Sequence, residues 1–228
     1  MSVGFAARAV LIDLDGTLVD SLPDIACAVN AMLADLGHSA LTVERIATYV
    51  GKGIDVLVHR ALTGTMDDAA AVPLFERARQ SFYQHYGAVN GNESRVFAEV
   101  REALEDLRSK QLKLACVTNK PREFTFQLLH KTDLRGAFNF IVSGDDIQQK
   151  KPHPEPMLHA SKLLGVAAVD AIAIGDSEND VLSAQAAGCR VIVVETGYNE
   201  GRSLSELNAD AIVPSLLDAA RLIKLQTD

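Results

Sequence analysis

Residues 9–21 read AVLIDLDGTLVDS. The apolar run 9–12 is typical of a buried strand, and Asp13 ends it with a charge. Asp13 and Asp15 are two residues apart, so the turn after the strand keeps both carboxylates within reach of one ligand. Gly16 permits a sharp backbone bend beside that ligand. The pattern favours a site that holds a metal ion and attacks an electrophile, although such residues also form ordinary acidic turns before a helix.

The composition is that of a globular protein with one large or two small domains. The chain has 228 residues, of which 48% are hydrophobic and 23% charged, enough for a sizeable core. The formal charge is -8 and Lys and Arg do not cluster, so we expect no nucleic-acid partner. Three widely spaced cysteines without a CxxC indicate a reducing, cytoplasmic setting. No apolar run is long enough to predict a signal peptide or a membrane span.

The order of the predicted elements indicates an α/β fold with a helical insertion. Residues 22–89 predict helices only, at 22–36, after Thr42, at 54–62 and from 67 or 68 to about 86. From residue 96 onward helices alternate with strands at 112–117, 140–142, 171–174, 191–194 and 211–213, and a last helix covers 215–225. Because these strands are apolar throughout, we expect a Rossmann-like parallel sheet with helices on both faces.

Polar residues follow four of the predicted strands. They are Asp13 and Asp15, then Thr118-Asn119, then Lys150-Lys151-Pro152-His153-Pro154, and finally Gly175-Asp176-Ser177-Glu178-Asn179-Asp180. Each set alone has an ordinary explanation as a turn, a helix cap or a solvated loop charge. In a parallel sheet, however, the carboxyl ends of the strands share one edge, where ligands bind. Together the four sets predict one common site.

These residue types suit the hydrolysis of a phosphate ester. A carboxylate nucleophile can divide the reaction through an aspartyl-phosphate, and a second carboxyl group can protonate the leaving oxygen. Carboxylates from two strands suit Mg²⁺, which prefers oxygen ligands. A lysine supplies positive charge against the phosphoryl oxygens, and hydroxyl and amide groups donate hydrogen bonds to them.

The four motifs, taken in order, resemble those of the haloacid dehalogenase superfamily of phosphohydrolases. The resemblance covers essentially the whole chain, and within the superfamily it is strongest to the phosphoglycolate phosphatases, through Tyr49-Val50-Gly51-Lys52-Gly53, Lys151-Pro152-His153-Pro154-Glu155-Pro156 and Gly197-Tyr198-Asn199. It implies a core domain formed by residues 1–20 and 90–228 and an all-helical cap domain formed by residues 21–89. It also implies hydrolysis of a small phosphorylated metabolite, most simply 2-phosphoglycolate, by a monomer or homodimer.

The resemblance assigns roles to the residues of the motifs. Asp13 is the expected nucleophile and Asp15 the expected general acid and base. Asp13, the main-chain carbonyl of Asp15, and Asp176 are the expected ligands of Mg²⁺.

The remaining roles concern the phosphoryl group and the cap. Thr118 and Lys151 are expected to bind the phosphoryl group, with Asn119 beside it. Asp180 is expected near the metal, either through water or by orienting Lys151. In the cap, Gly51 and Lys52 are candidate substrate contacts. A departure from the family pattern at Arg95-Val96-Phe97-Ala98-Glu99-Val100, where relatives often have a proline-glycine turn, bears on substrate identity and not on the reaction.

Other reactions of the superfamily differ in the residues that they need. A dehalogenase requires neither metal nor leaving-group acid, so Asp15 and Asp176 together argue against it. A phosphonate-cleaving relative would use a cap lysine such as Lys52 as a Schiff base, but would have a small residue in place of Asp15. A sugar-phosphate mutase or a broader sugar-phosphate phosphatase stays open, because it shares the core and differs in the cap. A non-catalytic binding module on this fold would be expected to have lost a core carboxylate or Lys151.

Overall fold

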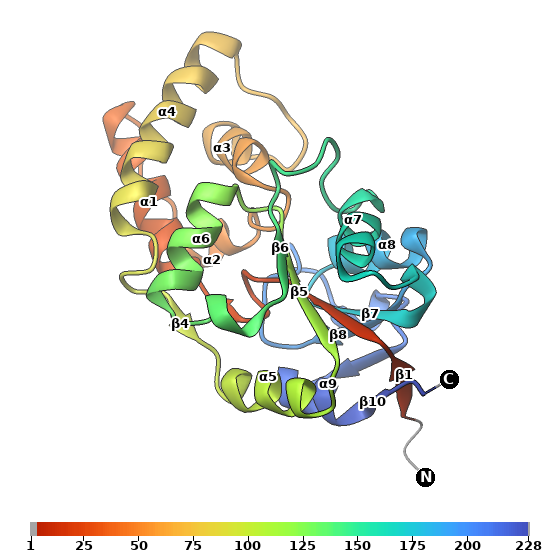
Figure 1. Cartoon of the computed structure of the whole chain (residues 1–228). Coiled ribbons are helices and arrows are strands. Elements are labelled where there is room, and N and C mark those ends of the chain that lie inside the picture. Colours follow the sequence, from red (N-terminus) through yellow and green to blue (C-terminus); the bar gives the residue numbers. More distant parts are fainter. Residues whose placement is uncertain (1–3, 228) are drawn as a thin grey trace.

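The computed structural model describes residues 4–227, and its centre is a six-stranded parallel sheet (Figure 1). The strands lie in the order β6-β5-β2-β7-β8-β9. Their bounds are β2 (Ala9–Ile12), β5 (Lys113–Val117), β6 (Phe140–Val142), β7 (Ala171–Gly175), β8 (Arg190–Val194) and β9 (Ala211–Val213). Because β2 pairs with β5 on one side and β7 on the other, Asp13 leaves the sheet near its middle.

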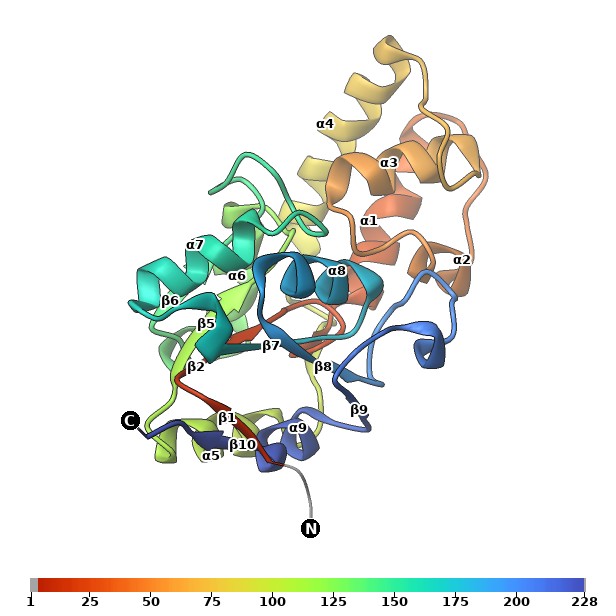
Figure 2. The ribbon, with the colours of Figure 1, turned by 90° about the vertical axis from the view of Figure 1, so that its right-hand side faces the viewer.

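Helices cover both faces of this sheet, as Figures 1 and 2 show. Val10 and Ile12 of β2 pack in one hydrophobic cluster with α5 (Val100–Ser109), α6 (Arg122–Lys131) and α9 (Leu216–Leu222). Ala9 and Leu11 point the other way, into a cluster with α7 (Glu155–Leu164) and α8 (Glu178–Ala187). This alternation is the period of two that a strand imposes, and it confirms the predicted Rossmann-like core.

The residues between β2 and β5 include four helices that share a hydrophobic core of their own. The helices are α1 (Leu22–Asp35), α2 (Val43–Ala47), α3 (Ile54–Thr63) and α4 (Val72–Val89). Each contributes fully buried side chains to one cluster, among them Met32, Ile46, Val58 and Phe82. Figure 2 shows these helices as a lobe beyond the sheet. The predicted all-helical insertion is therefore present.

The two chain segments that join this lobe to the sheet pair with each other. β3 (Val19–Asp20) and β4 (Arg95–Val96) form a short antiparallel ribbon. Next to it, the buried carboxylate of Asp24 on α1 accepts hydrogen bonds from the backbone N–H groups of Gly91, Glu93 and Ser94 at 2.8, 3.0 and 2.9 Å. One side chain of the first segment thus fixes the path of the second.

α4 and α9 differ most from the sequence-based expectation. The helix expected to begin at residue 67 or 68 begins at Val72, because Pro73, which lacks an N–H group, occupies its first turn. The last helix ends at Leu222 instead of residue 225. Ile223–Leu225 form β10, which pairs in parallel with β1 (Phe5–Ala7), so tertiary pairing overrides helical spacing there.

Short 3₁₀ helices complete the description, at Arg135–Ala137, Ala168–Asp170 and Leu204–Glu206. Within residues 4–227 no helix combines the length and the apolar character needed to cross a membrane.

Candidate active site

The polar residues after the strands converge at the carboxyl edge of the sheet, and Lys151 joins three of the sets. Its buried ammonium group lies 2.8 Å from Oδ1 of Asp13 and 2.6 Å from Oδ1 of Asp180. It also donates a hydrogen bond of 2.9 Å to the carbonyl oxygen of Val117, at the end of β5. The predicted meeting of residues more than a hundred positions apart is therefore observed for this lysine.

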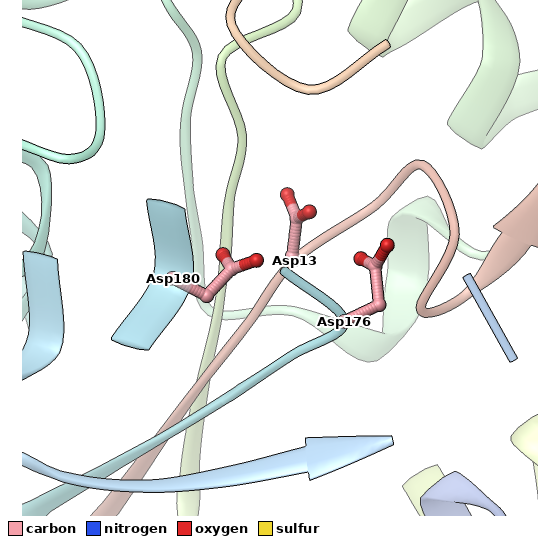
Figure 3. A group of neighbouring side chains, drawn as sticks. All are labelled: Asp13, Asp176 and Asp180. Atoms are coloured by element: carbon pink, nitrogen blue, oxygen red, sulfur yellow. The ribbon is translucent and has the colours of Figure 1, made fainter. Parts of the chain in front are cut away.

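Three carboxylates form an acidic cluster beside this lysine (Figure 3). Asp13, Asp176 and Asp180 each offer an oxygen atom, and these atoms all lie within 4.8 Å of one another. Burial raises the pKa of Asp13 to about 7, although the positive charge of Lys151 opposes the change. Burial and the negative charges of Asp13 and Asp180 also raise the pKa of Asp176. A cation would relieve this repulsion, and an all-oxygen donor set fits a hard ion such as Mg²⁺.

Asp176 is fixed in place by both of its oxygen atoms. Thr17 donates its hydroxyl to Oδ1 at 2.9 Å, and the backbone N–H of Tyr198 donates to Oδ2 at 2.7 Å. Gly16, with φ of +89°, passes so close that a Cβ atom there would lie 2.5 Å from Oδ2. The glycine of the first motif is therefore required both for its backbone conformation and for the space that the Asp176 carboxylate occupies.

Asp180 contacts Lys151 directly. Its Oδ2 accepts from the backbone N–H and the hydroxyl of Ser177 at 3.2 and 2.7 Å, which forms a capping box at the start of α8. Its Oδ1 accepts from Lys151. Of the two roles expected for this residue, the hydrogen-bond geometry favours orienting the lysine.

Asn119 holds the backbone around Lys151. Its side-chain oxygen accepts from the N–H of Lys151, and its side-chain nitrogen donates to the carbonyl oxygens of Lys151 and Gly51, each at 2.9 Å. The neighbouring Thr118 is buried, and its hydroxyl accepts from the N–H of Lys120 at 3.2 Å. Asn119 thus connects the loop that carries Lys151 to Gly51 in the helical lobe.

Asp15 faces a second lysine, Lys120, which the sequence motifs did not predict as a site residue. Lys120 places its ammonium nitrogen 2.9 Å from Oδ1 and 3.2 Å from Oδ2 of Asp15, and Ser21 donates its hydroxyl to Oδ1 at 2.5 Å. The same ammonium donates to the hydroxyl of Tyr86 on α4. Burial acts to lower the pKa of Lys120, but the charge of Asp15 and the contact with Tyr86 outweigh it and raise the pKa, so the side chain stays charged.

A cavity that is partly open to solvent connects these groups with the helical lobe. The core supplies mainly polar side chains to its lining, and the lobe supplies mainly apolar ones. The core residues are Asp13, Asp15, Thr118, Asn119, Lys120, Lys151, Ser177 and Asn179, and those of the lobe are Ile25, Val50, Gly51, Gly53, Ile54, Leu57, Phe82 and Tyr86.

Only one of the two predicted cap contacts lines this cavity. Gly51 does, whereas the ammonium of Lys52 lies 3.2 Å from Glu200 and Lys52 is not among the lining residues. Arg60, a fully buried residue of α3, lies 2.9 Å from the same carboxylate. Arg95, at the departure from the family pattern, is also not among the lining residues; it contacts Glu93 at 3.2 Å.

The segment 196–200 contacts both the acidic cluster and the helical lobe. Besides the hydrogen bond from Tyr198 to Asp176, Thr196 donates its hydroxyl to the carbonyl oxygen of Gly16 at 2.8 Å, and Tyr198 donates its hydroxyl to Asp20 at 2.5 Å. Glu200 then reaches the lobe through the ion pairs just described. We call this segment the bridging loop.

Comparison with known proteins agrees with the fold. A model described as haloacid dehalogenase-like hydrolase matches residues 10–194, and the chain belongs to this family. Phosphoglycolate phosphatase of Thiobacillus denitrificans is 46% identical over 216 residues, which cover 95% of each chain. The protein of that name from Escherichia coli (strain K12) is 37% identical and covers 92% of this chain and 90% of its own. The crystal structure of a predicted phosphoglycolate phosphatase from Haemophilus somnus 129pt superposes with a TM-score of 0.89 at 30% identity, covering 95% and 97% of the two chains.

Proposed function

We propose that the protein is a phosphatase that hydrolyses 2-phosphoglycolate to glycolate and phosphate in the presence of Mg²⁺. The observation that carries the proposal is the pairing of the two aspartates of the first motif with two buried lysines of one cavity, Asp13 with Lys151 and Asp15 with Lys120. The proposed nucleophile and the proposed proton donor therefore line the same cavity. The names of the relatives support the choice of substrate.

Asp13 and Asp15 divide the chemistry in this proposal. A carboxylate oxygen of Asp13 attacks phosphorus while the bond to the ester oxygen breaks, and Asp15 donates its proton to that oxygen, which leaves as the hydroxyl group of glycolate. Water then attacks the aspartyl-phosphate, Asp15 accepts its proton, and the bond from phosphorus to Asp13 breaks to release phosphate. Asp15 ends the cycle protonated, as it began.

Charge neutralisation and positioning supply most of the barrier reduction in phosphoryl transfer. Lys151, held by Asp180, and Thr118 bind the phosphoryl oxygens, and Asn119 keeps the loop of Lys151 in place. Asp13, the main-chain carbonyl of Asp15, and Asp176 would hold Mg²⁺, whose chemistry would be to neutralise charge on the phosphoryl group. The acidic cluster supports this assignment, because it gathers negative charge at low exposure.

We further propose that residues 21–89 act as the cap domain over a core formed by residues 1–20 and 90–228. The hydrophobic cluster formed mainly by α1 to α4, to which α6 of the core adds Phe124, and the paired connecting segments support this division. Closure of the cap over the cavity would exclude water from the reacting groups. The three cysteines, all unpaired in the structure, agree with the cytoplasmic location that we propose.

A direct test measures phosphate release with Mg²⁺ from 2-phosphoglycolate, glucose 6-phosphate and p-nitrophenyl phosphate. We expect kcat/KM for 2-phosphoglycolate to exceed that for the sugar phosphate by at least about 100-fold. A preference for the sugar phosphate would favour the sugar-phosphate enzymes instead. Absence of release from every ester would favour a non-catalytic module.

A further inference from the structure

Lys120 is a buried charged residue to which the proposed reaction gives no task. Its side chain is 4% exposed, yet it lines the cavity together with the reacting groups. Burying an ammonium group is costly unless it is paired, so a lysine here must have an anionic partner. In the structure that partner is Asp15, which has to carry a proton when it acts on the ester oxygen of the substrate, so Lys120 needs another anion in the substrate complex.

The contact between Lys120 and Asp15 locates this lysine relative to a bound substrate. The ester oxygen of the substrate must come within hydrogen-bond reach of Asp15, and the ammonium nitrogen lies 2.9 Å from that carboxylate. In a phosphorylated 2-hydroxy acid the ester oxygen and the carboxylate are attached to the same carbon atom. A substrate of this class that reaches Asp15 through its ester oxygen therefore brings its carboxylate next to Lys120.

The remaining surroundings favour a small acid over a sugar. Apart from Tyr86, the lobe side of the cavity presents Ile25, Val50, Ile54, Leu57 and Phe82, whose side chains cannot hydrogen-bond to the hydroxyl groups of a sugar. Among the described residues that line the cavity, the cations are Lys120 and Lys151. Lys151 faces Asp13, the proposed nucleophile, whereas Lys120 faces Asp15, which acts on the ester oxygen. Lys120 is therefore the cation at the leaving-group end.

We propose that Lys120 and the hydroxyl group of Tyr86 form a carboxylate-binding subsite. This subsite selects phosphorylated 2-hydroxy acids over phosphate esters whose leaving group is uncharged. The hydroxyl of Tyr86 accepts from Lys120, so its own proton remains available to donate to a second oxygen of the carboxylate. Lys120 follows β5 of the core, whereas Tyr86 belongs to α4 of the cap. The subsite is complete only when these two parts are in contact. This inference rests on the proposed phosphatase function.

The test compares two esters that differ only in the group that Lys120 would bind. They are 2-phosphoglycolate and 2-hydroxyethyl phosphate, in which a hydroxymethyl group replaces the carboxylate. The readout is the ratio of kcat/KM for 2-phosphoglycolate to kcat/KM for 2-hydroxyethyl phosphate. Loss of the contact with Asp15 affects both esters and cancels in the ratio. We expect Lys120→Met to lower the ratio about 100-fold, as loss of a charge-assisted hydrogen bond predicts, and Tyr86→Phe to lower it about 5-fold.

Lys113→Met is the matched control, because Lys113 lies at the opposite end of the same strand and donates to the carbonyl oxygen of Leu164. It should keep the wild-type ratio. A Lys120→Met enzyme that hydrolyses both esters with the wild-type ratio would overturn the subsite, while the phosphatase function would stand. If Lys120→Met fails to fold, an unchanged ratio in Tyr86→Phe has the same consequence.

Binding without turnover gives an independent measurement. Calorimetric titration of Asp13→Asn with 2-phosphoglycolate and Mg²⁺ should give a dissociation constant about 100-fold lower than that of the double variant Asp13→Asn/Lys120→Met. Equal dissociation constants would overturn the subsite. This result is readable even if the wild-type protein releases no phosphate from any ester, an outcome that would defeat the proposed function itself.

Discussion

Lys151 and Lys120 are both buried and each faces one aspartate of the first motif, but different parts of the molecule hold them. Lys151 is fixed by Asp13, Asp180 and the carbonyl oxygen of Val117, all from the core. Lys120 is held by Asp15 from the core and by Tyr86 from the cap. The proposed phosphoryl half of the site, around Lys151, thus holds its lysine with core groups alone, whereas the proposed leaving-group half, around Lys120, also uses a side chain of the cap. Reaction and substrate choice can therefore be disturbed separately.

Asp13→Asn should have the largest effect, since it removes the nucleophile from the phosphoryl half. We expect kcat to fall by at least about 1,000-fold. Asparagine has the same shape and removes a carboxylate whose pKa burial raises to about 7, so the fold should persist. Phosphate release and thermal unfolding measure the two effects. Activity near that of the wild type would remove Asp13 from the nucleophile role.

Asp24→Ala should loosen the cap while leaving the acidic cluster intact. It removes the acceptor of three backbone N–H groups of the second connecting segment, and we expect a loss of about 2–4 kcal/mol in the free energy of unfolding. Chemical denaturation measures this loss. Asp35→Ala, which removes an exposed carboxylate from the same helix, should leave the free energy of unfolding close to the wild-type value. Equal effects of the two substitutions would contradict the role of Asp24 in holding the second connecting segment.

Mg²⁺ should stabilise the protein against unfolding by binding at the proposed phosphoryl half, whether or not the cap is firmly held. At about 100 times its dissociation constant, Mg²⁺ should add about 2.7 kcal/mol to the free energy of unfolding and raise the melting temperature by roughly 5 °C. Asp176→Asn should lose this rise because it removes a predicted ligand, and Asp24→Ala should keep it. Differential scanning calorimetry with and without Mg²⁺ tests both. A rise of equal size in Asp176→Asn would place the ion elsewhere.

Glu200→Gln should have the smallest effect, through the cap side of the bridging loop. Its carboxylate pairs with buried Arg60 at 2.9 Å and with Lys52 at 3.2 Å, and we expect a cost of about 1–2 kcal/mol. Glu178→Gln removes an exposed pair with Arg202 and serves as control, with an expected cost of at most about 0.5 kcal/mol.

The effect of Glu200 should also depend on pH. Burial acts to raise its pKa, but the hydrogen bonds and charges of Arg60 and Lys52 outweigh burial and hold the pKa below its usual 4.5. A depressed pKa in the folded state means that the carboxylate stabilises the fold above pH 4.5 and loses this contribution as the pH falls through the folded-state pKa. The difference between wild type and Glu200→Gln should therefore narrow below pH 4.5. A difference independent of pH would rule out the charged pair as its source.

The sequence predicted the sheet and the convergence of its strand ends because both depend on local pattern. Apolar strands ending in Asp13, Thr118 and Asp176 can meet only at one edge of a parallel sheet. The connecting ribbon of β3 and β4 could not be predicted in this way, since two residues are too few to show a period. The same holds for β10, whose pairing with β1 joins the two ends of the chain.

Lys120 and Tyr86 were not among the predicted site residues, for a related reason. Lys120 directly follows the Thr118-Asn119 pair, so its position next to a motif was the available signal. Its partner Tyr86 gives no such signal, because an aromatic residue at helical spacing predicts only a buried face. Glu200 and Arg60 likewise meet across 140 positions of sequence. Contacts between cap and core depend on how these two parts are placed relative to each other, which no local sequence pattern encodes.

The bridging loop limits how far the cap can be treated as an exchangeable module. A chimera that exchanged residues 21–89 alone for the cap of a relative would leave Glu200 facing an unmatched surface, and Tyr198 would still connect that loop to Asp20. Because the same loop fixes Asp176, the mismatch would reach the acidic cluster. Transfer of substrate preference between relatives should therefore require residues 196–200 to be exchanged together with the cap.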